Sequence, residues 1–405
     1  MKRGPSPEEA RQILRSVNDG VVPLDLVHWF SVGRRKQLVI VAKGLDSTEG
    51  GKSRMLFVDG TYGAGKTHFL GLVTRQALKR RFLVTHVVLT PRECPLSSLT
   101  AIYRAILRGL RSPECPQRPA ISDILERWLT LCMKTVLTPE HLTRTCKHGL
   151  TYETCAYNCK DILFREYLEA LSEVSGSFAA IVKIYQHALD KRNTNVLGLA
   201  ERLLLGHRLD KRDIRRLGDY LPGCAATDNI TEASAIGGFQ DLAHFARIVG
   251  YRGLVVMLDE AESLPSVYER GMGKFQAFAN LITLAAKAME LRHLYFVYAT
   301  TPQFDQEVNW VSSQVLGDDM DRKKALLGLL NTRLQLPNLT REECCELGRK
   351  VRNIAVAAYG RDIPECEVDR AAADIFSAIP PATFTVRTFL TQLVPWIRSL
   401  ASQHT

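Results

Sequence analysis

A glycine-rich segment of the chain carries the residue types and spacing of a phosphate-binding loop. Residues 60–67 fit the pattern G-x-x-x-x-G-K-[ST] and lie between an apolar run that predicts a buried strand (residues 54–59) and a segment with helical spacing (residues 66–80). Glycines let backbone N–H groups turn toward phosphates, and the helix N-terminus adds a favourable dipole. Lys66 is expected to reach the outer phosphates and the Thr67 hydroxyl to bind Mg²⁺. ATP and Mg²⁺ are therefore the predicted cofactors, and the predicted nucleotide-binding residues are Gly60, Thr61, Tyr62, Gly63, Ala64, Gly65, Lys66, Thr67 and His68.

Two adjacent carboxylates, Asp259 and Glu260, follow a second apolar strand candidate at residues 254–258. Consecutive strand residues point in opposite directions, so one carboxylate can face a metal ion while the other faces water. We expect Asp259 to orient the Mg²⁺ shell and Glu260 to polarise the attacking water, which favours hydrolysis over phosphate transfer to a small acceptor. A solvated acidic pair at a turn is the structural alternative.

A third apolar strand candidate, residues 294–299, ends in the hydroxyls of Thr300 and Thr301. The carboxyl ends of parallel strands meet at one edge of a sheet, so this end should lie in the same crevice as the phosphate loop. Thr301, or else Thr300, is a candidate contact for the γ-phosphate or the attacking water. The alternative is that Thr300, Thr301 and Pro302 simply begin the next helix.

Two arginines are placed where they could report the state of a bound nucleotide. Arg333 precedes a fifth strand candidate, where oligomeric ATPases place an arginine that enters the neighbouring subunit's site. Arg387 begins the last predicted helix, from which it could touch the γ-phosphate. A guanidinium suits both roles because it is always charged and forks onto phosphate oxygens. Ordinary surface arginines are the alternative in both cases.

The elements that must position these residues alternate between strand and helix, which predicts an α/β fold with a parallel sheet. We expect an N-terminal helical segment over residues 1–50, with a helix to about Val17, a helix to about Ala42, and a loop over residues 44–53. The two halves of the core are predicted at residues 51–96 and 251–337. A helical insertion is predicted at residues 97–250 and a C-terminal helical lid at residues 338–405.

The composition is that of a globular intracellular protein. Its 405 residues are 46% hydrophobic, enough for a sizeable core, yet the apolar runs are far shorter than the about 20 residues that span a bilayer. The first residues do not resemble a secretory signal, so a cytoplasmic location is expected. Ten cysteines in a chain of this length predict buried thiols or metal ligands rather than a disulfide scaffold.

One group of cysteines could bind zinc. Cys146, His148, Cys155 and Cys159 supply enough ligands for a tetrahedral site, although only the last two cysteines approach the usual C-x₂₋₄-C spacing. Buried packing of the thiols is the alternative.

The positive charge suggests a polyanionic partner. The net charge is +10, and basic residues gather between Arg202 and Arg216, where they could follow a DNA backbone without reading its sequence. A solvated helix face is the alternative. The basic residues of this segment are Arg202, His207, Arg208, Lys211, Arg212, Arg215 and Arg216.

These motifs, in this order, resemble the ORC/STAND-like branch of AAA+ P-loop ATPases, and more closely the BrxD family of ATP-binding proteins from bacterial phage-exclusion (BREX) systems. The resemblance covers most of the chain, and it implies an oligomeric ATPase that acts in phage defence beside a helicase and other partners on DNA. The segments that carry it are residues 11–16, 31–34, 60–67, 250–262, 299–302 and 385–389.

Two other functions remain open from the sequence. A nucleotide-dependent scaffold would bind ATP tightly and signal by conformation with little turnover, and a P-loop kinase would phosphorylate a small molecule. Glu260 argues against the first, and the long helical region argues against the second.

Overall fold

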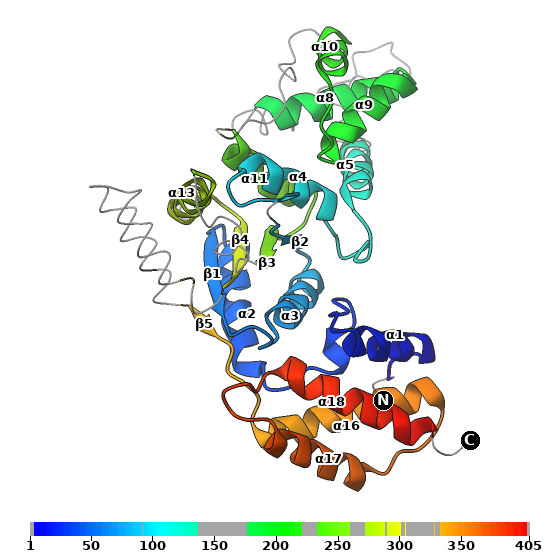
Figure 1. Cartoon of the computed structure of the whole chain (residues 1–405). Helices are drawn as coiled ribbons and strands as arrows, with labels where there is room; N and C mark the ends of the chain where they lie inside the picture. Colours follow the sequence, from blue (N-terminus) through cyan, green and yellow to red (C-terminus); the bar gives the residue numbers. More distant parts are fainter. Residues whose placement is uncertain are drawn as a thin grey trace.

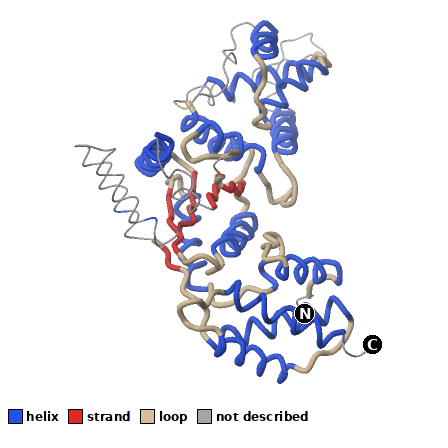
Figure 2. Tube along the Cα trace, in the orientation of Figure 1, coloured by secondary structure: helices blue, strands red, loops and turns tan. Residues whose placement is uncertain are grey.

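A computed structural model gives the arrangement of the chain (Figure 1). It describes residues 4–90, 92–136, 176–220, 232, 234–259, 272–287, 290–300, 304, 328 and 333–402. A central sheet separates two groups of helices, one that includes both ends of the chain and one that extends away from them (Figures 1 and 2).

The sheet has five parallel strands in the order β2-β3-β4-β1-β5, which confirms the predicted α/β class and the fifth strand. In chain order the strands are β1 (Arg54–Asp59), β2 (Leu83–Val88), β3 (Leu254–Asp259), β4 (Leu294–Thr300) and the short β5 (Leu334–Gln335). Helix α3 (Lys66–Lys79) joins β1 to β2, and α13 (Met272–Lys287) lies between β3 and β4. The fold is thus compatible with a P-loop ATPase core.

Both faces of the sheet are buried, because successive strand residues enter different apolar clusters. On β1, Met55 and Phe57 join one cluster, whereas Leu56 and Val58 join the other. The first cluster contains residues of α4 (Leu99–Gly109), α5 (Ile121–Val136), α11 (Ala235–Ile248) and α13. The second contains residues of the N-terminal and C-terminal helices and of α3. Burial on both faces explains why the strands are continuously apolar rather than alternating.

Helix α1 (Pro7–Asn18) begins as its capping residues predict, whereas α2 (Arg35–Glu49) is longer than expected. Helix α1 opens with a capping box in which Ser6 and Glu9 each accept a hydrogen bond from the other's backbone N–H. Helix α2 runs over Arg35–Glu49, so the loop predicted from residue 44 is wrong for its first half. Gly44 lies inside the helix because it packs against a buried tyrosine: a Cβ there would lie 2.5 Å from the Tyr295 hydroxyl.

Between β2 and β3, the described residues are largely helical and form two layers. Helices α4 and α11 pack on the sheet, whereas α8 (Gly176–Asp190), α9 (Thr194–Leu204) and α10 (Lys211–Tyr220) share a second apolar cluster. Phe178, Val182 and Leu204 of α8 and α9 join the sheet-side cluster instead and connect the two clusters. Figure 1 shows α8, α9 and α10 on the far side of α4 and α11 from the sheet. This three-helix group therefore has a small core of its own: Ala180, Ile184, Ala188, Val196, Leu199, Ala200, Leu209, Ile214 and Leu217.

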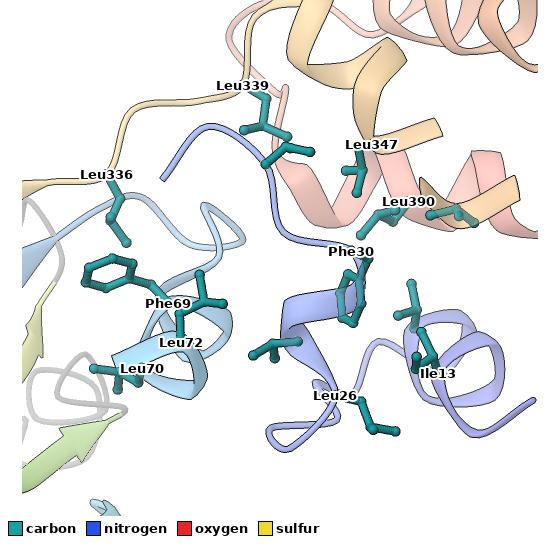
Figure 3. Packing of buried hydrophobic residues seen from close by; sticks show 14 of the residues in the cluster. Ile13, Leu26, Phe30, Phe69, Leu70, Leu72, Leu336, Leu339, Leu347 and Leu390 are labelled. Atoms are coloured by element: carbon teal, nitrogen blue, oxygen red, sulfur yellow. The ribbon is translucent and has the colours of Figure 1, made fainter. Parts of the chain in front are cut away.

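The C-terminal helices are α16 (Arg341–Tyr359), α17 (Glu365–Ala378) and α18 (Val386–Ser402). Their apolar side chains meet those of the N-terminal segment and of α3, as Figure 3 shows for Phe30 beside Leu390 and Leu347. No helix among the described residues is both long enough and apolar enough to cross a membrane.

Candidate nucleotide-binding site

The phosphate loop connects β1 to α3 through two glycines in backbone conformations that other residues rarely adopt. Gly63 and Gly65 have φ values of +80° and +92°, and Gly65 is the N-cap of α3. The Ala64 N–H donates to the Thr61 carbonyl at 3.1 Å, which closes the turn. A Cβ at Gly65 would have no neighbour closer than 3.9 Å, so this glycine is needed for its conformation rather than for lack of space.

Lys66 lies within this loop and is 6% exposed. Its Nζ donates to the carbonyl oxygens of Gly60 at 3.0 Å and Thr61 at 3.3 Å. A buried ammonium held by its own loop can exchange these neutral acceptors for phosphate oxygens, which bind it more strongly. The loop thus fits a polyphosphate, with Lys66 and the N-terminal turn of α3 as its binding groups.

Asp259 ends β3 at the same edge of the sheet as the phosphate loop. Leu258 and Phe57 both pair with Tyr298 of the intervening strand, so Asp259 comes level with Val58 near the end of β1. The Asp259 carboxylate is nearly fully buried, which is costly for a charge without compensating contacts. The Asp259 carboxylate thus lies at the edge of the sheet where a metal ion bound to the phosphates would be held.

His86 contacts this carboxylate from the neighbouring strand. Its Nε2 lies 3.2 Å from Oδ2 of Asp259, and both side chains are largely buried. In the register of β2 and β3, Val88 pairs with Asp259, which places His86 two residues back along β2, on the same face as Val88. No local pattern in the sequence singles out His86, because its proximity to Asp259 depends on strand order and register.

A cavity opens beside the phosphate loop, and three parts of the chain line it. Its walls contain loop residues 62–68, apolar residues of the N-terminal segment, and residues of the C-terminal helices. Loop glycines and Lys66 lie at one part of the lining, and Phe30, Val32 and Leu347 supply an apolar part. A cavity with one cationic and one apolar region suits a nucleotide, which carries phosphates at one end and a flat base at the other.

Arg34 ties the phosphate loop to the start of the C-terminal region. Its guanidinium donates to the carbonyls of Pro337 at 2.9 Å and Ala64 at 3.1 Å. Burial lowers the pKa of Arg34, and the nearby Glu343 carboxylate opposes that shift. The sequence marks Arg34 only as part of a family resemblance. In the structure its side chain links the phosphate loop to the segment that precedes α16.

His68 forms part of the same wall. Its Nε2 lies 3.2 Å from the Val27 carbonyl, and its ring lies 5.0 Å from that of Phe30. Burial lowers the pKa of His68 to about 4, so the ring is neutral near pH 7. In this structure the polar contact of His68 is with the N-terminal segment.

Arg387 reaches the phosphate loop from the first turn of α18. Its Nη1 donates to the Tyr62 hydroxyl at 2.6 Å, and its backbone N–H donates to the Gly63 carbonyl at 3.4 Å. Arg387 also lines the cavity. The expectation that this arginine approaches the nucleotide site is therefore consistent with its position.

Arg333 lies beside its own chain's first strand. Its Nε is 3.9 Å from Oδ2 of Asp59, the buried residue that ends β1, and Gln335 donates to the same oxygen at 2.9 Å. The structure thus places Arg333 at the β1 and β5 edge, with part of its charge facing a carboxylate of the same subunit.

Several predicted site residues lie outside the described residues. These are Glu260, Thr301 and the candidate zinc ligands Cys146, His148, Cys155 and Cys159. Within the part of the chain that the structure describes, no group of three or more histidine, cysteine, aspartate or glutamate side chains forms a metal site. Because its four candidate ligands lie outside this part of the chain, the zinc site stays a prediction.

The predicted basic segment is described, and its charged residues face solvent. It covers the end of α9, the loop that follows and α10, while Leu204, Leu209, Ile214 and Leu217 between the basic residues are buried. The exposed basic side chains are those of Arg202, His207, Arg208, Lys211, Arg212, Arg215 and Arg216.

A parallel sheet with a phosphate loop after its first strand, a cavity beside that loop and an acidic residue at the same edge of the sheet defines a P-loop nucleotide-binding protein. The family model of the BREX system ATP-binding protein BrxC/D matches residues 6–405, and the chain belongs to this family. It is accordingly an ATP-binding protein of BREX defence. Comparison with curated proteins found no match to the chain.

Proposed function

We propose that this chain is a Mg²⁺-dependent ATPase of the AAA+ type that changes its contacts with partner proteins and DNA according to the bound nucleotide. The observation that carries the proposal is the cavity in which the phosphate loop, the N-terminal segment and Arg387 meet, at the sheet edge where Asp259 ends β3. A glycine-rich turn without a binding function would not be expected to line a cavity together with two other parts of the chain.

In the proposed mechanism, the loop amides and Lys66 bind the phosphates and spread their negative charge. Thr67 and Asp259 would hold Mg²⁺, which would neutralise negative charge on the phosphates. Glu260 would accept a proton from the attacking water, and Thr301 would help to orient that water. The C-terminal helices would act as a lid that carries Arg387 to the nucleotide.

The first test separates nucleotide binding from hydrolysis. Lys66→Ala should abolish ATP binding, whereas Glu260→Gln should still bind ATP but lose about 100-fold or more in phosphate release, since a positioned base contributes 10²–10⁴. Equilibrium binding of a fluorescent ATP analogue and steady-state phosphate release measure the two properties. Normal hydrolysis by the Glu260 variant would reject the assignment of the base.

The same assay separates the proposal from its alternatives. A nucleotide-dependent scaffold would bind ATP through Lys66 but release negligible phosphate in the wild type. A small-molecule kinase would release little free phosphate and would leave a phosphorylated acceptor, which mass spectrometry of a metabolite extract incubated with the protein would detect.

We further propose that the protein works as a homo-oligomer in which Arg333 enters the neighbouring subunit's site. Arg333→Ala should then lower phosphate release only at concentrations where the subunits assemble. An equal loss at dilutions that leave the protein monomeric would instead place the effect of Arg333 within one subunit, beside Asp59. Analytical ultracentrifugation fixes the two concentration ranges.

The exposed basic residues of α9 and α10 are the proposed contact with DNA. Because the contact is with phosphates, it should be independent of DNA sequence and should weaken as the salt concentration rises. A plot of log affinity against log salt concentration should have a slope of about −0.9 for each neutralised phosphate. Replacing Arg215 and Arg216 by alanine should flatten that slope, whereas the matched change of Arg11 and Arg15 on α1, which are also two exposed arginines, should not. Absence of duplex binding at low salt would reject a DNA contact.

A helicase or another protein of the defence system is the proposed partner in the cell.

A further inference from the structure

Tyr62 is an aromatic residue at an exposed position of the phosphate loop. Its side chain is not part of the core, because 67% of the residue is exposed. The Tyr62 hydroxyl accepts a hydrogen bond from Nη1 of Arg387 at 2.6 Å, and Cζ of Arg387 lies 4.9 Å from the centre of the Tyr62 ring. One side chain therefore holds the guanidinium both by a hydrogen bond and by the face of its ring.

The backbone around this pair is also in contact. The Arg387 N–H donates to the Gly63 carbonyl, and a Cβ at Gly63 would lie only 2.9 Å from the side chain of Thr385. The start of α18 is thus packed against the loop, directly beside Tyr62. Without Tyr62, a long arginine side chain at this position would still sample many rotamers, and ordering it on ligand binding has an entropic cost.

We propose that Tyr62 is a positioning residue that holds Arg387 beside the phosphate loop, so that the guanidinium can contact the terminal phosphate of ATP without first being ordered. This inference rests on the proposed function, in which Arg387 reads that phosphate. A guanidinium has five N–H donors, so donating one to Tyr62 leaves others for phosphate oxygens. ADP lacks the terminal phosphate, so Tyr62 should raise the affinity for ATP and leave the affinity for ADP unchanged.

A competing role for Tyr62 is direct contact with a part of the nucleotide that ATP and ADP share. That role predicts an equal loss of affinity for both nucleotides when Tyr62 is removed. Positioning through Arg387 predicts a loss confined to the nucleotide with three phosphates, and no further loss once Arg387 is absent. The two roles are therefore separable by affinities alone.

The experiment measures the affinities of the full-length protein for ADP and for the non-hydrolysable analogue adenylyl imidodiphosphate, both with Mg²⁺, by isothermal titration calorimetry. The variants are Tyr62→Ala, Tyr62→Phe, Arg387→Ala and the double variant Tyr62→Ala with Arg387→Ala. Tyr359→Ala, which removes a partly exposed tyrosine on α16, is the matched control. Because Tyr62 packs in no core cluster, its removal should leave the thermal unfolding midpoint unchanged.

Arg387→Ala should reduce the preference for the analogue over ADP about tenfold, as expected for one charge-assisted hydrogen bond. Tyr62→Ala should reduce it about fivefold and Tyr62→Phe less, since the phenyl ring keeps the contact with the cation. The double variant should match Arg387→Ala, because Tyr62 acts only through that side chain.

Equal losses for the two nucleotides in Tyr62→Ala, an unchanged preference, or additive losses in the double variant would each overturn the inference. Failure of the proposed function has a different signature, namely wild-type binding that persists in Lys66→Ala. A preference that survives in Arg387→Ala would remove the role of Arg387 and the inference with it, while leaving the phosphate loop in place.

Discussion

At the scale of single residues, the contact between His86 and Asp259 gives a prediction about metal binding. A neighbouring group that orients a metal ligand typically contributes 10–100-fold in metal affinity. His86→Ala should therefore raise the Mg²⁺ concentration for half-maximal phosphate release about tenfold. The measurement is a Mg²⁺ titration of phosphate release at saturating ATP.

The control for this prediction is nucleotide binding in the presence of EDTA, which His86→Ala should leave unchanged because His86 is placed against the carboxylate rather than the phosphate loop. His86→Gln retains an N–H donor and should lie between the wild type and the alanine variant. An unaltered Mg²⁺ requirement would show that Asp259 keeps its orientation without His86.

A second residue, His28, gives a prediction about pH. Burial, with Arg75 and Lys79 nearby, lowers the pKa of His28 from 6.5 to about 4. The unfolded chain therefore binds a proton between about pH 6.5 and 4 that the folded chain does not, so His28 destabilises the fold as the pH falls through that window. Because His28 is partly exposed, we expect a loss of only about 1–2 kcal/mol.

The measurement is urea unfolding of the wild type and of His28→Gln at pH 7, 6, 5 and 4. Other groups titrate in the same range, so the informative quantity is the difference in unfolding free energy between the two proteins. That difference should shift in favour of the glutamine variant as the pH falls. A constant difference would indicate that His28 has an ordinary pKa in the folded protein.

At the scale of elements, the packing of α2 on β4 depends on a glycine within a helix. Gly44→Ala would normally favour a helix, but its Cβ would lie 2.5 Å from the buried Tyr295 hydroxyl. We expect a net loss of about 1–3 kcal/mol, as for other overpacked sites. Thermal unfolding should show only a small recovery when Tyr295→Phe is added, because the ring carbons Cζ and Cε1 would still lie 2.6 Å and 2.8 Å from the Cβ.

Gly50→Ala serves as the control, because its Cβ would meet only backbone atoms at 3.5 Å, an ordinary contact distance. Gly44→Ala with wild-type stability would mean that α2 can move away from β4 without cost. No recovery in the double variant would mean that the ring carbons of Tyr295, rather than its hydroxyl, oppose the methyl group.

Gly44 also illustrates what the sequence could and could not predict. Runs of apolar residues predicted the strands and the parallel sheet, and capping residues predicted the start of α1. A glycine followed by polar residues predicted a loop at residue 44. The prediction failed because the contact that favours glycine there comes from Tyr295, on a strand about 250 positions away. Tertiary packing overrode the local signal.

The same distinction holds for the candidate site. A contiguous pattern identified the phosphate loop, and the end of an apolar strand identified Asp259. His86 and Arg34 had no such local pattern, because each acts across strands or across the link to the C-terminal helices. Their roles depend on register and on long-range contacts, which one sequence does not specify.

At the scale of the whole molecule, the separate core of α8, α9 and α10 predicts local rather than global instability. Leu217→Ala should cost about 2–4 kcal/mol within that group, since it removes a fully buried side chain. Hydrogen exchange measured by mass spectrometry should accelerate in peptides of these three helices. Nucleotide affinity should not change.

Arg216→Ala, an exposed neighbour of Leu217, is the control and should leave exchange unaltered. Faster exchange in β1 or α3 of the Leu217 variant would contradict the prediction, because it would show that the three helices unfold together with the sheet. Equal exchange everywhere would show that the small core tolerates the cavity.

Because α8, α9 and α10 bury apolar residues mainly among themselves, evolution can remodel them with little regard for the ATP site. Selection acting on the exposed surface of these three helices is then largely uncoupled from selection acting on the phosphate loop. Related proteins can accordingly keep one nucleotide-binding site while the sequence of these three helices changes.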